Sequence, residues 1–454
     1  MKKFITIVIA LISVNAFSSF NKDKVKRMFW NNLEVIWLED ERFPTYNAMF
    51  YFADGALSDG VREKGATEAA FDLLSYGTRR FSRQDIADNL DFFGVSYGAS
   101  VTHEYSLFTV QGLTKDIAPT IKKICHLFQD ATYPKAELKV TKKRAITSIN
   151  SKVNDPGTIA SMAFREMSLA GSPFAYPVSG KKKDIVRFNT KMLRKKMDYF
   201  NEKVKKRIYL SGPKSVLSIE DIINKECGWT GKADFERTAK YEPIKSKGKP
   251  NIYLVTVPKA NQAQVRIGKF INQEDLKRES DFVLASEFLG GGFTSRLMRV
   301  LRNKHGLTYS VSAFAGSQKV YGRAGIATFT KSSTVEKLLS ETKNTIEEIE
   351  SGNFDEVDLS RSKGFISGSF PFRFETSDSL LRQIVLLDHE RKSLSSLDSF
   401  KDEIKSINKK HLQSLIKSFY HWNDQTIVVV GEKSLLKQLT KFGDVKVLSY
   451  RRFL

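Results

Sequence analysis

Cysteine is scarce in this chain, which has only Cys125 and Cys227 among its 454 residues. Neither cysteine has the spacing of a metal-ligand set, so a metal site built on thiolates is excluded. Cys125 shares the apolar face of an expected helix with Ile121, Ile124 and Phe128, which favours a buried free thiol. A disulfide between the two cysteines stays open, because export would allow it and the sequence alone does not decide it.

Other absences narrow the function. The six histidines nowhere form HExxH or HxxEH, the patterns that place two histidines on one helix face to bind zinc. Beyond the amino-terminal segment, no stretch has the roughly 20 apolar residues that a membrane-spanning helix requires. The glycine run at 290–292 lacks both the GxGxxG spacing and the lysine of a phosphate-binding loop. These absences argue against zinc binding by this chain, against a membrane span and against nucleotide binding.

The amino terminus has the three parts of a secretory signal peptide. Two lysines precede the apolar stretch 4–12, and small residues follow around Ala16 and Ser18. This order is typical of a cleavable signal, to which we assign residues 1–18. The sequence therefore predicts an exported chain, with the periplasm as the expected compartment.

The charge is strongly basic, with 73 lysines and arginines against 51 acidic residues and a net charge of +22. That sign suits nucleic acid, an anionic membrane surface or acidic peptides. Because an exported protein rarely meets the genome, and because no recognition motif is present, we expect no nucleic-acid partner. Basic clusters occur at 181–183, 191–196 and 203–207. Solvated helix faces are the default explanation for them, and a basic wall that attracts acidic peptides is the alternative.

Comparison of the chain with itself reveals a duplication. RIYLSGPKSVL at 207–217 matches TIVVVGEKSLL at 426–436, with an offset of 219 residues. GVSYGASV at 94–101 matches GLTYSVSA at 306–313, with an offset of 212 residues. A period this long indicates a duplicated domain rather than a solenoid repeat.

Each copy mixes strands with long helices. Alternating apolar residues predict strands at 46–52, 97–101 and 105–110 in the first copy and at 263–267 and 326–330 in the second. Helical spacing predicts helices at 68–75 and 117–129, and again at 334–351. We therefore expect an α+β fold of two homologous domains, each a mostly antiparallel sheet covered by helices. The expected order is an N-terminal domain at 19–229, a polar linker at 230–250 and a C-terminal domain at 251–454.

The segment Leu289–Gly316 holds a glycine loop, an arginine and a tyrosine in one compact unit. Residues 295–304 have helical periodicity, and Gly306 suits the left-handed position that ends a helix. Alternation from residue 309 onward predicts a strand. Arg302, in the last helical turn, and Tyr309, at the start of the strand, are expected to lie close together as a clamp for carbonyl oxygens or a carboxylate. A capping arginine and a core tyrosine are the alternative.

The glycine loop is a candidate substrate-binding segment. Gly290, Gly291 and Gly292, followed by Phe293, would let a peptide backbone approach closely. A simple turn from a strand to a helix explains the same residues equally well.

This pattern resembles the pitrilysin (insulinase) peptidase family, most of all its half-length members related to the mitochondrial processing peptidase. The motifs that carry the resemblance are QAQ at 262–264, LGGG at 289–292, SRL at 295–297, GLTYSV at 306–311 and NDQTIVVVGE at 423–432. The resemblance covers nearly the whole chain after the signal. It implies two homologous α+β domains that pair with a second two-domain subunit to enclose a chamber. It also implies that Arg302 and Tyr309, seven residues apart as in the family, contact the substrate near the scissile bond.

The family's HxxEH zinc motif is missing, although the residues that frame it are present. Glu68, Phe71 and Asp72 stand where the two histidines and the glutamate between them belong, and the further glutamate ligand falls on Thr147 or Ser148. No zinc ligand and no general base remains, so no metal is expected in this chain. Glu68 and Asp72 are four residues apart and could hold a hard cation, but solvated charges on a helix are the favoured explanation.

The resemblance and the missing ligands together predict the zinc-free subunit of a heterodimeric zinc endopeptidase that acts on peptides or unfolded proteins. A homologous partner with HxxEH would supply the zinc and the base, while this chain lends Arg302 and Tyr309. The chain alone is expected to be inactive. A catalytically inactive scaffold or peptide-binding protein of the same fold is the alternative.

Overall fold

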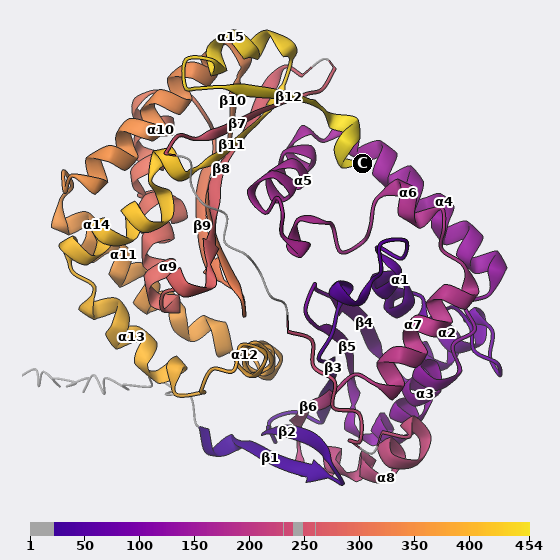
Figure 1. Cartoon of the computed structure of the whole chain (residues 1–454). Coiled ribbons are helices and arrows are strands. Elements are labelled where there is room, and N and C mark those ends of the chain that lie inside the picture. The colour runs from indigo at the N-terminus through magenta and orange to yellow at the C-terminus, as the bar shows by residue number, and fades with distance from the viewer. Residues whose placement is uncertain (1–21, 230, 239–247, 259) are drawn as a thin grey trace, which may run out of the picture.

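Two six-stranded sheets organise the structure, a computed structural model that describes residues 22–229, 231–238, 248–258 and 260–454. We call each sheet with its helices a lobe (Figure 1). The predicted signal peptide at 1–18 lies outside the described residues. Within the described ranges, no helix is both long and apolar enough to cross a bilayer.

The first sheet has the strand order β1-β2-β6-β3-β5-β4. Only β2 and β6 pair in parallel, and every other pair of neighbours is antiparallel. The central strand β3 is buried along nearly its whole length because both faces of the sheet are covered. The strands are β1 (Val25–Trp30), β2 (Leu33–Glu39), β3 (Thr45–Phe52), β4 (Ser96–Val101), β5 (Ser106–Leu113) and β6 (Lys206–Gly212).

The second sheet repeats this order as β12-β7-β11-β8-β10-β9. Strands β6 and β11 hold equivalent central places, each parallel to one neighbour and antiparallel to the other, as the duplication predicts. The two sheets differ at one edge, where β12 pairs in parallel with β7 but β1 pairs antiparallel with β2. The strands are β7 (Asn251–Thr256), β8 (Gln262–Asn272), β9 (Val311–Ser317), β10 (Tyr321–Lys331), β11 (Thr426–Gly431) and β12 (Val445–Ser449).

Helices cover both sheets, so the predicted α+β fold is confirmed. In the first half of the chain they are α1 (Ala66–Asp72), α2 (Arg83–Phe92), α3 (Ile117–Asp130), α4 (Lys135–Ser151), α5 (Pro156–Ser168), α6 (Lys182–Ile185), α7 (Thr190–Glu202) and α8 (Glu220–Ile222). In the second half they are α9 (Glu279–Ser286), α10 (Val335–Glu350), α11 (Glu356–Ser369), α12 (Ser377–His389), α13 (Ser396–Ser406), α14 (Lys409–Tyr420) and α15 (Leu436–Leu439). The stripe of apolar residues on α3 and on α10 is buried, as helical periodicity requires.

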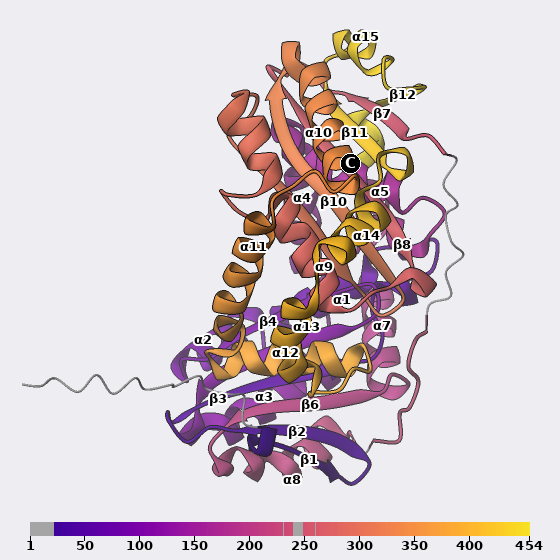
Figure 2. The ribbon, with the colours of Figure 1, turned by 90° about the vertical axis from the view of Figure 1, so that its left-hand side faces the viewer.

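The two halves of the chain exchange one helix each. Helix α12 lies between the sheets in Figure 2 and buries Leu381, Ile384 and Val385 in the core of the first lobe. In return, α5 lies on the inner face of the second sheet, where Ile159 and Phe164 join a core with residues of β7 and β11. Each sheet is therefore closed on one face by a helix from the other half of the chain.

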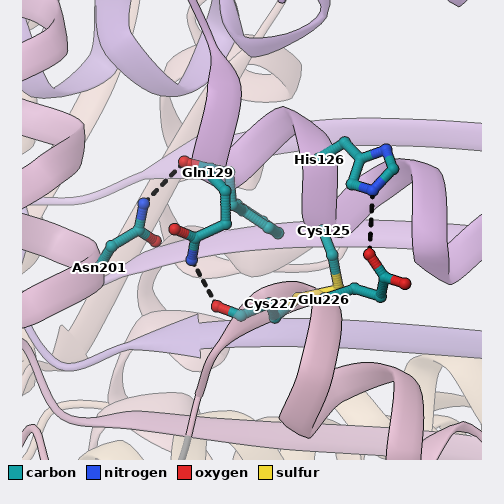
Figure 3. The surroundings of a disulfide bond; sticks show 7 residues. Cys125, His126, Gln129, Asn201, Glu226 and Cys227 are labelled. Carbon is teal, nitrogen blue, oxygen red and sulfur yellow. Dashed lines mark hydrogen bonds and ion pairs between the residues drawn. A yellow bond between two sulfur atoms is a disulfide. The ribbon is translucent and has the colours of Figure 1, made fainter.

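Cys125 and Cys227 form a disulfide that joins α3 to the helical turn Ile223–Cys227 (Figure 3). The free thiol that we favoured for Cys125 is therefore wrong. Packing of α3 against the helical turn Ile223–Cys227 brings the two Cα atoms to 4.5 Å, across 102 residues of sequence. The Gln129 amide strengthens the same junction by donating a hydrogen bond to the carbonyl oxygen of Cys227.

The predicted linker is anchored where the structure describes it. Phe235 exchanges backbone hydrogen bonds with Lys203 and Lys205 at the end of α7. The Arg237 guanidinium lies 2.7 Å from the buried carboxylate of Asp54. Residues 231–238 therefore belong to the first lobe, and residues 230 and 239–247 lie outside the described residues.

Candidate functional site

The glycine loop is shaped by two close contacts. Helix α9 continues into the helical turn Glu287–Gly291, where Gly290 packs against β9. A Cβ atom on Gly290 would lie 2.6 Å from the backbone nitrogen of Ala313, so only glycine fits. The Glu287 side chain occupies the space beside Gly291 and Gly292. Burial raises the pKa of Glu287, so the carboxyl group beside the loop ionises less readily than a free glutamate.

The helical segment that carries Arg302 runs over Met298–Lys304, inside the predicted range 295–304. Gly306 has φ of +59° and ends the helix as predicted. Its N–H donates to the carbonyl oxygen of Arg302, and the next N–H donates to Leu301. These bonds satisfy the last carbonyls of the helix and fix the backbone at Arg302.

Strand β9 begins at Val311, two residues later than predicted, and leaves Tyr309 outside the ladder. The cause is the hydroxyl of Thr308, which accepts from the backbone N–H of Ser310 and also donates to its carbonyl oxygen. A local bond of this kind competes with strand pairing. The Tyr309 side chain is 79% exposed as a result, so the alternative of a core tyrosine does not hold.

Arg302 has an aromatic neighbour, but it is Phe293. The guanidinium carbon lies 5.6 Å from the centre of the Phe293 ring, within the range of a cation–π contact. Phe293 is itself 75% exposed. Within the described part of the chain, no hydrogen bond joins Arg302 to Tyr309. The glycine loop thus presents an exposed aromatic ring stacked on an arginine, with an exposed phenol after the same helix.

Helix α1 occupies the place of the missing zinc motif. Phe71 is almost fully buried and packs edge-on against Phe52 and Phe200, with ring centres 5.2 and 5.1 Å away. A side chain in that position contacts core rings, so it cannot activate water. Burial, together with the charge of Asp72, raises the pKa of Glu68 to about 7. Burial raises the pKa of Asp72 itself to about 6.

These residues do not fit zinc. Thr147 and Ser148, which stand at the position of the further glutamate ligand, are exposed on α4 and offer only hydroxyl groups. Among the described residues, no group of three or more histidine, cysteine, aspartate or glutamate side chains could hold a metal ion. No step of catalysis is therefore assigned to a metal in this chain.

The scaffold around α1 is intact even though its ligands are missing. Gly65 has φ of +89° at the start of the helix, where a Cβ atom would lie 2.4 Å from the carbonyl oxygen of Ser179. The buried carboxylate of Asp59 accepts hydrogen bonds from the backbone N–H groups of Gly65 and Thr67. The Lys196 ammonium pairs with it at 3.2 Å. Sequence reasoning missed this buried pair, because Asp59 and Lys196 lie far apart in the chain and neither belongs to a motif.

A separate cavity of about 520 Å³ lies at the joint between the first sheet and α12. The amide groups of Asn47 and Gln111 donate to the carboxylate of Asp378 at the start of α12. Arg42 and Ser377 donate to Asp40 beside it. None of the predicted site residues lines this cavity, which therefore belongs to the joint and not to the glycine loop.

Residues 208–364 match the protein family described as "Peptidase M16 inactive domain". The match covers about a third of the chain, and the relatives found along most of its length are similar to it at 23% identity or less. The predicted family resemblance is confirmed, and the match is to the inactive type of domain. The chain is also 23% identical over 436 residues to the "Non-peptidase homolog YmxG" of Helicobacter pylori, covering 95% of this chain and 99% of that relative.

Solved structures agree on the fold. The peptidase M16 inactive domain from Pseudomonas fluorescens superposes with a TM-score of 0.79 at 20% identity, covering 90% of this chain and 98% of that one. The periplasmic protease PqqL from Escherichia coli gives a TM-score of 0.74 at 14% identity. That alignment covers 90% of this chain but 46% of PqqL, so this chain spans about half of the PqqL length.

Proposed function

We propose that this chain is the zinc-free subunit of an exported two-subunit peptidase. The observation that carries the proposal is a half-buried Arg302 in contact with exposed Phe293 and followed by exposed Tyr309, beside a glycine loop in a chain whose described residues hold no group of zinc ligands. Both aromatic side chains are open to contact with a ligand or a partner subunit. A homologous subunit with HxxEH would supply the zinc and the base.

The roles of the side chains follow from their chemistry. The guanidinium of Arg302 and the hydroxyl of Tyr309 are donors that can stabilise negative charge developing on the oxygen of a peptide carbonyl. Gly290, Gly291 and Gly292 leave room for a peptide backbone, and Phe293 offers an apolar surface to a substrate side chain. The proposed substrates are peptides or unfolded proteins, because donors of this kind act on an extended backbone.

Export is part of the proposal. The disulfide between Cys125 and Cys227 supports it, because structural disulfides persist in oxidising compartments and are rare in the cytosol. The lysine-flanked apolar stretch at 4–12 supports it independently. The proposed compartment is the periplasm, which is also that of the structurally similar PqqL.

The test is reconstitution with a zinc-bearing homologue. The purified chain should contain no stoichiometric zinc and should not cleave a fluorogenic peptide, whereas the mixture with an HxxEH-bearing partner should cleave it. In that mixture, Arg302→Ala and Tyr309→Phe should each lower kcat by about 10- to 1000-fold. Tyr97→Phe, at the equivalent place of the first copy, is the matched control and should leave the rate unchanged. Zinc-dependent cleavage by the lone chain would overturn the proposal.

A catalytically inactive scaffold or peptide-binding protein is the second candidate. The name of the Helicobacter pylori relative, a non-peptidase homologue, favours it. It predicts a stable assembly in which peptide binding and complex formation are unaffected by Arg302→Ala and Tyr309→Phe. A mixture that never cleaves peptide but keeps its assembly in both variants would select this candidate.

A further inference from the structure

Positive charge is concentrated on one part of the first lobe. Residues 135–206 contain 18 lysines and arginines and six aspartates and glutamates. This segment thus carries 12 of the net 22 positive charges within 72 of the 454 residues. It forms α4, α5, α6 and α7; Arg165 is the exposed cation of α5, and exposed lysines lie on α4, α6 and α7.

Hydrogen bonds hold these three helices together as one surface. The Lys142 ammonium on α4 donates to the carbonyl oxygens of Val186 and Phe188, just after α6, at 2.6 and 3.0 Å. The Thr190 hydroxyl at the start of α7 donates to the carbonyl oxygen of Tyr133, just before α4, at 2.8 Å. Helices α4, α6 and α7 lie on the same side of the molecule in Figure 1. We call the exposed cations of these three helices the basic face.

Five lysines on and beside these helices have exposed side chains. Within the part of the chain that the structure describes, no ion pair involves Lys139, Lys143, Lys183, Lys191 or Lys195, and all five are exposed. Asp198 and Glu202 lie exposed on α7 and offset part of its positive charge, whereas two other nearby acidic groups are engaged elsewhere. The Glu137 carboxylate pairs with Arg83, and the buried Asp184 accepts from the hydroxyl of Tyr176. The charge of this face is thus available to an external anion.

Two aliphatic side chains stand among the lysines. Val140 on α4 is 45% exposed and Val186 beyond α6 is 50% exposed. The hydrogen bond from Lys142 to Val186 places the second valine beside α4. Lysines with exposed aliphatic groups between them suit the boundary between lipid headgroups and acyl chains, because the lysines attract anionic headgroups and the aliphatic groups leave water.

We propose that this face docks on an anionic phospholipid surface. Lysine outnumbers arginine on it, and a flexible point charge suits a diffuse layer of headgroups better than it suits paired recognition of single carboxylates. No large aromatic side chain is exposed in the described range 135–206, so a platform for stacking nucleic-acid bases is missing. The face lies in the first lobe and uses neither Arg302 nor Tyr309, so membrane docking is independent of the proposed peptidase role.

The test is co-sedimentation of the mature, disulfide-bonded chain with vesicles. It should bind vesicles of phosphatidylglycerol and phosphatidylcholine and not vesicles of phosphatidylcholine alone, and added salt should weaken the binding. Each cation at the surface contributes about fivefold in affinity, so combined Lys139→Gln, Lys143→Gln, Lys183→Gln and Lys191→Gln should weaken binding at least about 100-fold.

A matched control removes the same charge from the second lobe. Combined Lys337→Gln, Lys410→Gln, Lys433→Gln and Lys437→Gln changes four exposed lysines outside the basic face and should weaken binding no more than about fivefold. Equal loss in both quadruple variants would show a non-specific effect of net charge and would overturn the proposal.

A second variant tests the aliphatic part of the face. Val140→Ser with Val186→Ser leaves every charge in place and should weaken vesicle binding several-fold without changing its dependence on salt. Tighter binding to polyglutamate or to duplex DNA than to the anionic vesicles would point to an acidic protein or a nucleic acid instead, and either result would reject the lipid surface.

Discussion

The disulfide should contribute a large share of the stability of the first lobe. Replacing both cysteines, as Cys125→Ala with Cys227→Ala, opens a closed loop of 102 residues. In the chain-entropy treatment, a loop of about 100 residues corresponds to about 4.7 kcal/mol, and losses of about 2–4 kcal/mol are typical for native bonds. We expect the free energy of unfolding of the first lobe to fall by about 2–5 kcal/mol.

Tryptophan fluorescence can isolate that lobe. Trp30, Trp37 and Trp229 are buried in its core, and Trp229 packs against Phe128 with ring centres 5.0 Å apart. Trp422 is the remaining tryptophan and lies in the core of the second lobe. In a Trp422→Phe background, urea unfolding followed by fluorescence therefore reports the first lobe, and far-ultraviolet circular dichroism reports both.

Two results would refute the reasoning. An unchanged urea midpoint in the double alanine variant would show that the loop closure does not restrict the unfolded chain. Titration of two free thiols in the native protein, purified from an oxidising compartment, would show that the bond does not form. Reduction of the wild-type chain should reproduce the loss seen in the variant, because both remove the same constraint.

Three further predictions concern α1, the helix exchange and the glycine loop. Burial raises the pKa of Glu68 to about 7, so the folded chain holds a proton that the unfolded chain releases near pH 4.5. The free energy of unfolding should therefore fall as the pH rises from about 5 to 8. Glu68→Gln should have a higher melting temperature than the wild type at pH 8, and a difference that does not shrink towards pH 5 would contradict this. Ile384→Ala should cost about 2–5 kcal/mol in urea unfolding, because this α12 side chain is fully buried in the first lobe, and a loss below 1 kcal/mol would contradict the helix exchange. Gly290→Ala should lower the free energy of unfolding by about 1–3 kcal/mol, because the new Cβ atom clashes with Ala313. Gly364→Ala, which has open space around it in α11, should raise the free energy of unfolding by about 0.4–1 kcal/mol. Equal effects of the two substitutions would refute the close packing at Gly290.

The fold was accessible from the sequence where it depends on local patterns. The repeated RIYLSG and TIVVVG segments became β6 and β11 in equivalent places, because a mostly apolar strand between two covered faces leaves a strong signal. The helix around residue 121 and the stop at Gly306 also follow from local spacing and backbone conformation. The missing zinc ligands were visible for the same reason, since HxxEH is a local motif.

What the sequence did not reveal depends on contacts between distant segments. Helix α12 belongs to the second half of the chain, and no local pattern shows that the first sheet buries its apolar side chains. The disulfide required the packing of α3 on a turn 102 residues later. The late start of β9 required one hydroxyl, that of Thr308, to bind the backbone of Ser310. The contact of Arg302 with Phe293 depends on how the glycine loop folds back, which periodicity does not encode.

Because α12 covers one face of the first sheet, that face stays exposed for most of the time that the ribosome takes to synthesise the chain. The missing cover consists of residues 377–389, so 389 of the 454 residues must be made before the early strands are sealed. Nascent chains with an open apolar sheet are prone to aggregate, which gives a holding chaperone a reason to act on this polypeptide. If the two lobes were expressed as separate fragments, each would expose an apolar sheet face and should aggregate, whereas the two fragments produced together should be soluble.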